Sequence, residues 1–249
     1  MCGIIAAATE KSVGKLLIQG LYKMEYRGYD SAGIALHQSS EIAHLRSLGK
    51  VKSLESRMKK EKPSGKVGIA HTRWATHGKP SELNAHPHVS HERVYIVHNG
   101  IIENYVKLKE GLEKKGYEFK SETDSELIAH QLDAFLNEKT NMLEAMSLLK
   151  EKLEGAYAIA AIDQNDESRF FLTRSKSPLL LGVSSDGVFA ASDPLALADL
   201  TNEFIFLEDG DVAEVSAREY KILDVNKKRA IRKITKLDIS LEAMGKSGY

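Results

Sequence analysis

Cysteine is nearly absent from this chain: Cys2 is the only one among 249 residues. A single cysteine forms no intramolecular disulfide and supplies no cysteine-based zinc cluster. Because nothing in the chain requires an oxidising compartment, we expect a cytoplasmic protein.

The chain also has no excess of charge of either sign and no long apolar run. Lys and Arg together number 35, as do Asp and Glu, so the net charge is zero. This balance argues against a nucleic acid or an anionic membrane as the main partner. No apolar run approaches the roughly 18 residues that a membrane-spanning helix needs. The first apolar run stops at Glu10 without a preceding basic region, so no secretory signal is expected.

The remaining composition is that of a globular protein, with 42% hydrophobic and 28% charged residues. The length fits one large domain or two small ones. Apolar runs predict buried strands at 3–8, 31–36, 67–70 and 94–97, followed by strands near 156–162, 169–173, 179–183, 187–191, 203–207, 211–215 and 220–224. Apolar spacing predicts helices at 12–26, 51–62, 103–115, 142–154 and 194–200, and a capping-box pattern at Thr123–Glu126 predicts one more, to about 138. Short strands with grouped helices indicate an α+β fold with antiparallel sheets.

The position of Cys2 directly after the initiator methionine suggests a nucleophile. Removal of Met1 would leave a thiol and an α-amino group on one residue. A terminal amine has a pKa of about 7.7–8.0, so part of it is neutral at pH 7 and can accept the thiol proton. The alternative is that Cys2 is a small buried hydrophobe, as most free cysteines are.

Asn99 and Gly100 follow the predicted strand at 94–97. An Asn-Gly pair in this place is typical of a tight turn. It is also suited to an oxyanion hole, in which the Asn99 amide and the Gly100 backbone N–H stabilise charge that develops in the transition state. The residues alone leave both alternatives open.

Two charged residues are candidates for binding a small molecule. Arg73 can bind a carboxylate through two parallel hydrogen bonds, or it can form an ordinary ion pair. Asp124 can neutralise an ammonium group, or it can simply favour the N-terminus of a helix.

Six of the nine histidines fall between residues 71 and 98. They are His71, His77, His86, His88, His91 and His98. No pair of them shows the helical His-Glu-x-x-His spacing of a zinc hydrolase, so we predict histidines that pack and form hydrogen bonds, and no metal. A metal-dependent hydrolase remains one alternative function, and a non-catalytic module that binds a small molecule with an inert Cys2 remains another.

Taken together, six motifs resemble one family. They are Met-Cys-Gly-Ile at 1–4, Tyr-Arg-Gly-Tyr-Asp-Ser-Ala-Gly at 26–33, His-Thr-Arg-Trp-Ala-Thr-His-Gly at 71–78, Asn-Ala-His-Pro-His at 84–88, His-Asn-Gly-Ile-Ile-Glu-Asn at 98–104 and Ser-Glu-Thr-Asp at 121–124. This set resembles the glutaminase domain of the isomerizing glutamine–fructose-6-phosphate aminotransferases, within the class II glutamine amidotransferases. The amidophosphoribosyltransferase branch is the alternative, although it has His-Arg-Gly-Gln-Asp in place of the motif at 26–30.

The resemblance implies an N-terminal-nucleophile hydrolase fold, a four-layer αββα sandwich of two antiparallel sheets. It also implies roles for individual residues. Cys2 would be the nucleophile, Asn99 and Gly100 the oxyanion hole, and Arg27 a support beside the nucleophile. Arg73, Thr76 and His77 would hold the α-carboxylate of glutamine, Asp124 with Gly100 its α-ammonium, and Trp74 would lie on the loop that closes over it.

The resemblance finally implies a domain organisation and partners. Residues 1–225 would form the glutaminase domain, and residues 226–249 would begin a linker to an absent sugar-isomerase half. The substrate would be L-glutamine, no cofactor would be needed, and the full-length enzyme would be a homo-oligomer. The ammonia released would serve the conversion of fructose 6-phosphate to glucosamine 6-phosphate in that full-length enzyme.

Overall fold

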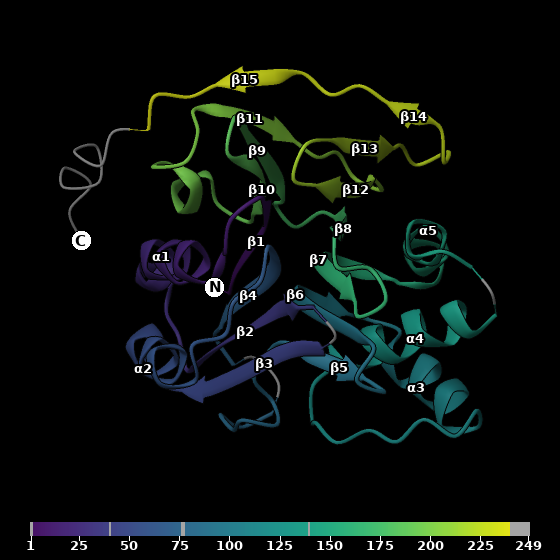
Figure 1. Cartoon of the computed structure of the whole chain (residues 1–249). Coiled ribbons are helices and arrows are strands. Elements are labelled where there is room, and N and C mark those ends of the chain that lie inside the picture. The colour runs from purple at the N-terminus through teal and green to yellow at the C-terminus, as the bar shows by residue number, and fades with distance from the viewer. Residues whose placement is uncertain (1, 40, 76–77, 139, 240–249) are drawn as a thin grey trace.

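Two antiparallel sheets face each other at the centre of the computed structural model, which describes residues 2–39, 41–75, 78–138 and 140–239 (Figure 1). The first sheet has the order β15 (Ile234–Lys236), β11 (Glu203–Phe206), β9 (Leu180–Ser184), β10 (Gly187–Ala191), β1 (Gly3–Thr9), β4 (Val67–Arg73), β2 (Ser31–Gln38), β3 (Glu41–Leu48). The second has the order β14 (Arg229–Ala230), β13 (Tyr220–Leu223), β12 (Val212–Ser216), β8 (Arg169–Ser175), β7 (Gly155–Asp163), β6 (Val94–Ile102), β5 (His88–Ser90).

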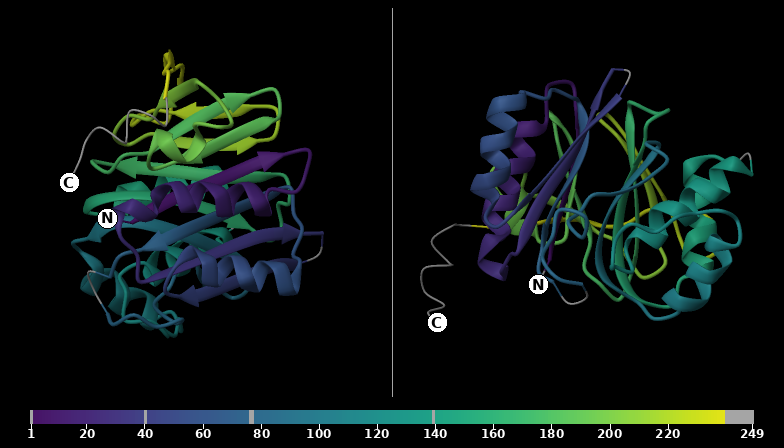
Figure 2. Two further views of the ribbon diagram at one scale, coloured as in Figure 1. Left: turned by 90° about the vertical axis from the view of Figure 1, so that its left-hand side faces the viewer. Right: turned by 90° about the horizontal axis from the view of Figure 1, so that it is seen from below.

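Helices cover the outer face of each sheet, which produces four layers (Figure 2). The first sheet is covered by α1 (Gly14–Met24) and α2 (Val51–Glu61), and the second by α3 (Tyr105–Glu113), α4 (Glu126–Asn137) and α5 (Met142–Lys152). Two short 3-10 helices, η1 (Glu25–Arg27) and η2 (Pro194–Leu197), complete the set. The predicted four-layer αββα architecture is therefore present.

The apolar run of β1 is uninterrupted because both faces of the strand are buried. Ile4, Ala6 and Ala8 face the second sheet and belong to the core between the sheets. Ile5 and Ala7 point the other way, into the core beneath α1 and α2. A strand buried on both faces needs apolar residues at every position rather than at alternate ones.

The segment after residue 225 pairs with both sheets. β14 pairs with β13 at the edge of the second sheet, and β15 pairs with β11 at the edge of the first. Figure 1 shows this segment in yellow, lying across both sheets. The predicted domain boundary at residues 225 and 226 stays a prediction, but β14 and β15 are part of the folded unit.

The capping box predicted at Thr123–Glu126 is wrong. α4 begins at Glu126. Ser125 is its N-cap residue, but the Ser125 side chain makes no capping hydrogen bond. The Glu126 carboxylate instead accepts hydrogen bonds from the backbone N–H groups of Lys120 and Ser121. Because Glu126 is the first helical residue and not the third, its side chain reaches back into the preceding loop.

Candidate active site

Cys2 lies where β1 begins, next to the end of β4. Gly3 pairs with Thr72 in the antiparallel ladder, which brings Cys2 beside Trp74. The Trp74 backbone N–H donates a hydrogen bond to Cys2 Sγ at 3.3 Å, and the thiol donates to the Trp74 carbonyl at 3.6 Å. The sheet register thus determines where the predicted nucleophile sits.

Burial raises the pKa of the Cys2 thiol, although the hydrogen bond from the Trp74 backbone acts in the opposite direction. A raised pKa leaves less thiolate at pH 7 than an exposed cysteine would have, and the thiolate is the nucleophile. A proton acceptor close to the thiol is therefore needed for reaction at neutral pH.

Asn99 approaches Cys2 from the opposite sheet, and Gly100 follows it in β6. They do not form the tight turn that an Asn-Gly pair suggests, because both lie within β6 and pair with Ala158 and Tyr157 of β7. The Asn99 amide donates to the backbone carbonyl of Cys2 across 3.4 Å. The amide donor of the predicted oxyanion hole is thus next to the predicted nucleophile.

Gly100 occupies a position that only glycine fits. Its φ is +128°, and a Cβ built there would lie 1.9 Å from the carbonyl oxygen of Ala156. The close approach of β6 and β7 therefore excludes a side chain at the residue whose N–H is the second predicted oxyanion donor.

Arg73 ends β4 and is buried, with 4% of its surface exposed. Its Nη1 lies 3.3 Å from Asp30 Oδ1, and its Nη2 donates to the Gly78 carbonyl at 3.1 Å. Asp30 also accepts a hydrogen bond from the Ala75 backbone N–H. The Asp30 carboxylate therefore holds both Arg73 and the loop that follows it.

Asp124 is anchored to the strand that carries Asn99. Its Oδ2 accepts a hydrogen bond from the Ile102 backbone N–H at 2.8 Å, two residues beyond Gly100. This bond places the carboxylate near the oxyanion donors rather than on α4 itself.

Trp74 leads into the predicted substrate loop and is half exposed, at 51%. Its ring packs on Gly28, where a Cβ would lie 1.6 Å from the indole. Thr76 and His77, predicted to help bind the α-carboxylate, lie outside the described residues.

Arg27 is held by Asp193, the residue that precedes η2. Arg27 Nη1 lies 3.5 Å from Asp193 Oδ2, and the Tyr26 hydroxyl donates to the same oxygen at 2.8 Å. The role of Arg27 as a support for the nucleophile stays a prediction.

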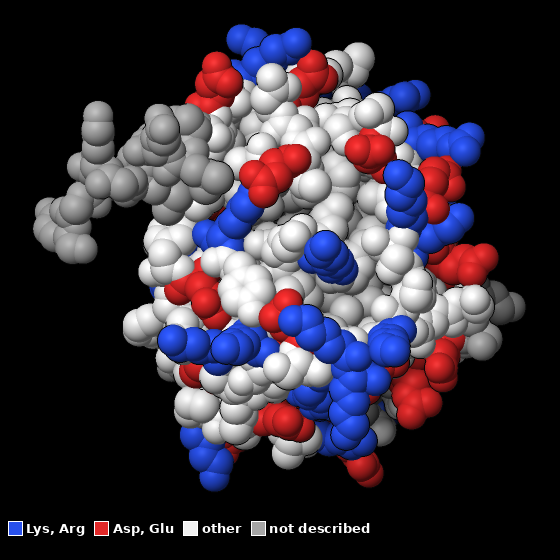
Figure 3. Space-filling view, turned by 60° about the vertical axis from the view of Figure 1, so that its left-hand side comes forward, with Lys and Arg blue, Asp and Glu red and all other residues white. Residues whose placement is uncertain are grey.

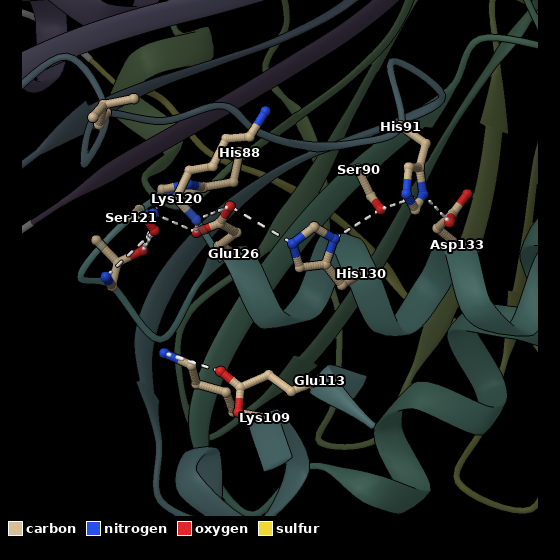
Figure 4. Close-up of polar contacts among 12 residues, drawn as sticks. His88, Ser90, His91, Lys109, Glu113, Lys120, Ser121, Glu126, His130 and Asp133 are labelled. Carbon is tan, nitrogen blue, oxygen red and sulfur yellow. Dashed lines mark hydrogen bonds and ion pairs between the residues drawn. The ribbon is translucent and has the colours of Figure 1, made fainter. Parts of the chain in front are cut away.

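Of the six histidines predicted to pack, four are buried: His71, His86, His88 and His98. His91 is exposed, and His77 lies outside the described residues. His91 and His130 belong to a network along α4 that joins Asp133, His91, Ser90, His130 and Glu126 (Figure 4). Within the described ranges, no group of three or more His, Cys, Asp or Glu side chains is placed to hold a metal ion.

The structure adds residues that sequence reasoning did not single out. Asp30 lies in a motif quoted above, but its role depends on the fold that brings β2 beside β4. His71 was identified only as one of a histidine cluster, and its Nε2 lies 3.0 Å from Asn99 Oδ1. No signal in the sequence pairs His71 with Asn99, because the two residues come from opposite sheets.

The surface carries mixed charge. On the face shown in Figure 3, Lys and Arg are interspersed with Asp and Glu. A cleft of about 840 Å³ lies elsewhere, around Thr9 and His37 at the far end of β1, and none of the predicted site residues lines it. No helix in the described part of the chain is long and apolar enough to cross a membrane.

The glutamine amidotransferase domain family matches residues 71–199, which are 129 of the 249 residues. The chain belongs to this family. Glutamine–fructose-6-phosphate aminotransferases (isomerizing) are its curated relatives. Those of Vibrio parahaemolyticus and Shewanella oneidensis are each 45% identical over 100% of this chain, and that of Haemophilus influenzae is 43% identical. The chain spans 41% of the length of each.

Solved structures confirm the N-terminal-nucleophile fold of this amidotransferase domain. The glutamine phosphoribosylpyrophosphate amidotransferase of Bacillus subtilis has a TM-score of 0.78, with 21% identity, over 92% of this chain and 50% of that one. A class II glutamine aminotransferase domain protein of Silicibacter pomeroyi has a TM-score of 0.62 over 90% of this chain and 99% of that one. At 21% identity, the first likeness concerns the fold and does not favour the amidophosphoribosyltransferase branch.

Proposed function

We propose that this amidotransferase domain hydrolyses L-glutamine to L-glutamate and ammonia through a thioester on Cys2. The observation that supports this most directly is the meeting of Cys2 and Asn99 from opposite sheets, with the Asn99 amide 3.4 Å from the Cys2 carbonyl. The buried Arg73 and the anchored Asp124 supply charges for the two ends of an amino acid.

The proposed reaction begins with proton transfer from the Cys2 thiol to the Cys2 α-amine, directly or through water, once Met1 is removed. Sγ then attacks the carboxamide carbon of glutamine, and the oxyanion accepts hydrogen bonds from the Asn99 amide and the Gly100 N–H. The amine returns the proton to the leaving nitrogen, and ammonia departs. Water hydrolyses the γ-glutamyl thioester, which releases glutamate and restores the thiol.

The buried histidines are poor substitutes for the amine. Burial lowers the pKa of His71 to about 3 and also lowers the pKa of His98. A base with so low a pKa takes a thiol proton unfavourably at pH 7. This supports the N-terminal amine as the proton acceptor.

Substrate binding is proposed to use the charges at both ends of glutamine. Arg73, with Thr76 and His77, would pair with the α-carboxylate, and Asp124, with Gly100, would pair with the α-ammonium. A glutamine analogue that lacks either charge would leave one of these groups unpaired, so the site should reject it. Trp74 would cover the bound substrate from the loop that begins at the end of β4.

The relatives suggest the wider context. We propose that the chain works as the glutaminase part of a longer, cytoplasmic and homo-oligomeric enzyme. There the ammonia would serve the conversion of fructose 6-phosphate to glucosamine 6-phosphate in a sugar-isomerase half. No cofactor is assigned to the glutaminase reaction, because thiol, amine and water account for all of its steps.

The test measures glutamate release from glutamine by two preparations, one without Met1 and one retaining it, with both states verified by intact mass. Activity only in the Met-free sample is expected, and Cys2→Ala in that form should abolish it while glutamine still binds. Activity in both samples would keep a cysteine glutaminase but require another base. Activity in neither would favour a glutamine-binding module or a domain that depends on a further part of the enzyme.

A further inference from the structure

His71 lies at the centre of the predicted site without a role in the reaction proposed above. It is fully buried on β4 and faces the second sheet. Its Nε2 lies 3.0 Å from Asn99 Oδ1, so it contacts the residue that would supply one oxyanion donor.

The orientation of the Asn99 amide decides whether that donor exists. One side of the amide is an acceptor oxygen and the other is a donor NH₂, and the two have nearly the same shape. In the structure the oxygen faces His71, and the NH₂ faces Cys2 at 3.4 Å from its carbonyl. Turned by 180°, the amide would put its oxygen against the Cys2 carbonyl and against the developing oxyanion.

We propose that His71 is a positioning residue for the oxyanion hole: its Nε2–H holds Asn99 Oδ1, so that the Asn99 NH₂ points at the reacting carbonyl. This inference rests on the proposed glutaminase function. His71 itself touches neither the substrate nor Cys2; it acts through Asn99.

The surroundings of His71 select the tautomer that this role requires. The Asn99 NH₂ donates to the Cys2 carbonyl at 3.4 Å, so the amide oxygen is the atom that faces His71 Nε2. An acceptor oxygen needs a donor opposite it, so this arrangement places the imidazole proton on Nε2. With the proton on Nδ1, two acceptors would face each other and Asn99 would turn away from its present contact.

The cluster of buried histidine rings behind His71 keeps it neutral. His71 packs on His86 with ring centroids 4.1 Å apart, and His86 packs on His88 at 4.6 Å. Burial lowers the pKa of His71 and of His88 to about 3, and that of His86 well below its usual value. The hydrogen bond to Asn99 therefore keeps the same donor and acceptor throughout the neutral pH range.

The kinetic test compares His71→Leu with His71→Gln in the Met-free chain. Leucine removes the donor, and we expect kcat for glutamine hydrolysis to fall about 10- to 100-fold with KM changed less than about 3-fold, because only transition-state binding is lost. In His71→Gln, the side-chain amide restores an N–H donor, and this variant should recover most of kcat. His37→Leu removes another buried histidine, whose Nε2 donates to the Asp163 carbonyl at 2.8 Å, and should lower the melting temperature without changing kcat.

A double mutant separates positioning from general loss of structure. After Asn99→Ala, the further change His71→Leu should reduce kcat less than about 2-fold, because residues that act as a unit are not additive. Multiplicative losses, or a His71→Leu variant with wild-type kcat, would overturn the proposal.

The tautomer is measured without reference to activity. Long-range ¹⁵N–¹H correlation spectra of the wild-type chain, with His71 assigned by its loss in His71→Gln, should show the proton on Nε2. A proton on Nδ1 would contradict the inference even in an active enzyme. An inactive wild-type chain with the proton on Nε2 would instead contradict the proposed glutaminase function and leave the arrangement of His71 and Asn99 supported.

Discussion

Arg73 Nη1 lies 3.3 Å from Asp30 Oδ1, so the guanidinium predicted to bind substrate is already paired with a carboxylate of the protein. Asp30 also accepts from Ala75, which lies in the loop after Arg73. The pair orients the planar guanidinium before any ligand arrives.

Arg73→Lys should therefore weaken glutamine binding although the charge is kept. Lysine has no planar fork, so it cannot pair with Asp30 and with a substrate carboxylate in two parallel bonds. We expect KM for glutamine to rise at least about 10-fold, in line with the loss of about 1.4 kcal/mol or more of binding. Arg93→Lys is the control. Arg93 Nε lies 3.4 Å from Asp163 Oδ1, and this ion pair is away from the predicted site. An unchanged KM in Arg73→Lys would remove Arg73 from the binding site.

Gly28→Ala should displace the Trp74 ring, which occupies the space where the Cβ would lie. The φ of Gly28 is +99°, so the substitution also strains the backbone. Gly49→Ala provides the matched control, because Gly49 has a φ of +81° but its Cβ would meet nothing closer than 4.0 Å. We expect a raised KM for glutamine in Gly28→Ala alone, measured by steady-state kinetics, with tryptophan fluorescence altered in the same variant. Equal kinetics in the two variants would show that the Trp74 contact does not matter for binding.

Sequence patterns predicted most of the strands because the sheets are buried on both faces. Runs such as Ile4–Ala8 are apolar throughout. Few structures other than a strand buried on both faces require such an uninterrupted apolar run. β3 was missed because it lies at the edge of its sheet and alternates exposed with buried residues over Glu41–Leu48. β5 was missed because it has three residues in a stretch rich in histidine and proline.

The arrangement of the strands and the contacts of the site were not readable from the chain. β1 lies between β4 and β10, whose residues are far from it in sequence. The motifs named Cys2, Arg73 and Asn99, but the contact of His71 with Asn99 depends on two sheets facing each other. Local patterns carry no information about such distant pairing.

Gly100→Ala should damage the fold and not merely the reaction. The new Cβ would meet the Ala156 carbonyl oxygen at 1.9 Å in a backbone conformation with φ +128°. We expect the free energy of unfolding to fall by more than about 2 kcal/mol. Gly111→Ala is the matched control, since Gly111 lies in α3 with open space around it, and alanine there should stabilise the helix by about 1 kcal/mol. Urea denaturation measures both, and a Gly100→Ala variant as stable as the wild type would contradict the packing argument.

The Cys2 thiol should ionise at higher pH in the folded chain than in the unfolded chain, because burial disfavours the thiolate. The rate of alkylation by iodoacetamide, which follows the thiolate, should rise with a midpoint above the roughly 8.5 of a free cysteine. The chain with Met1 retained is used, so that no amine shares the residue, and the single cysteine makes the signal unambiguous. The same chain in denaturant gives the reference; a folded midpoint at or below it would refute the expectation.

Arg232 joins the segment between β14 and β15 to the body of the domain, and its loss should reduce stability. Its Nη2 and Nε lie 2.7 Å and 2.9 Å from the two carboxylate oxygens of Asp211, which is fully buried. Arg232→Ala would leave that carboxylate buried without its cationic partner, which costs about 3 kcal/mol. Lys236→Ala in β15 removes an exposed pair with Glu203, and exposed pairs contribute about 0–1 kcal/mol. Thermal and urea unfolding should therefore separate the two variants clearly. Equal stabilities would show that the segment after residue 225 contributes little to the fold and would support a domain that ends before it.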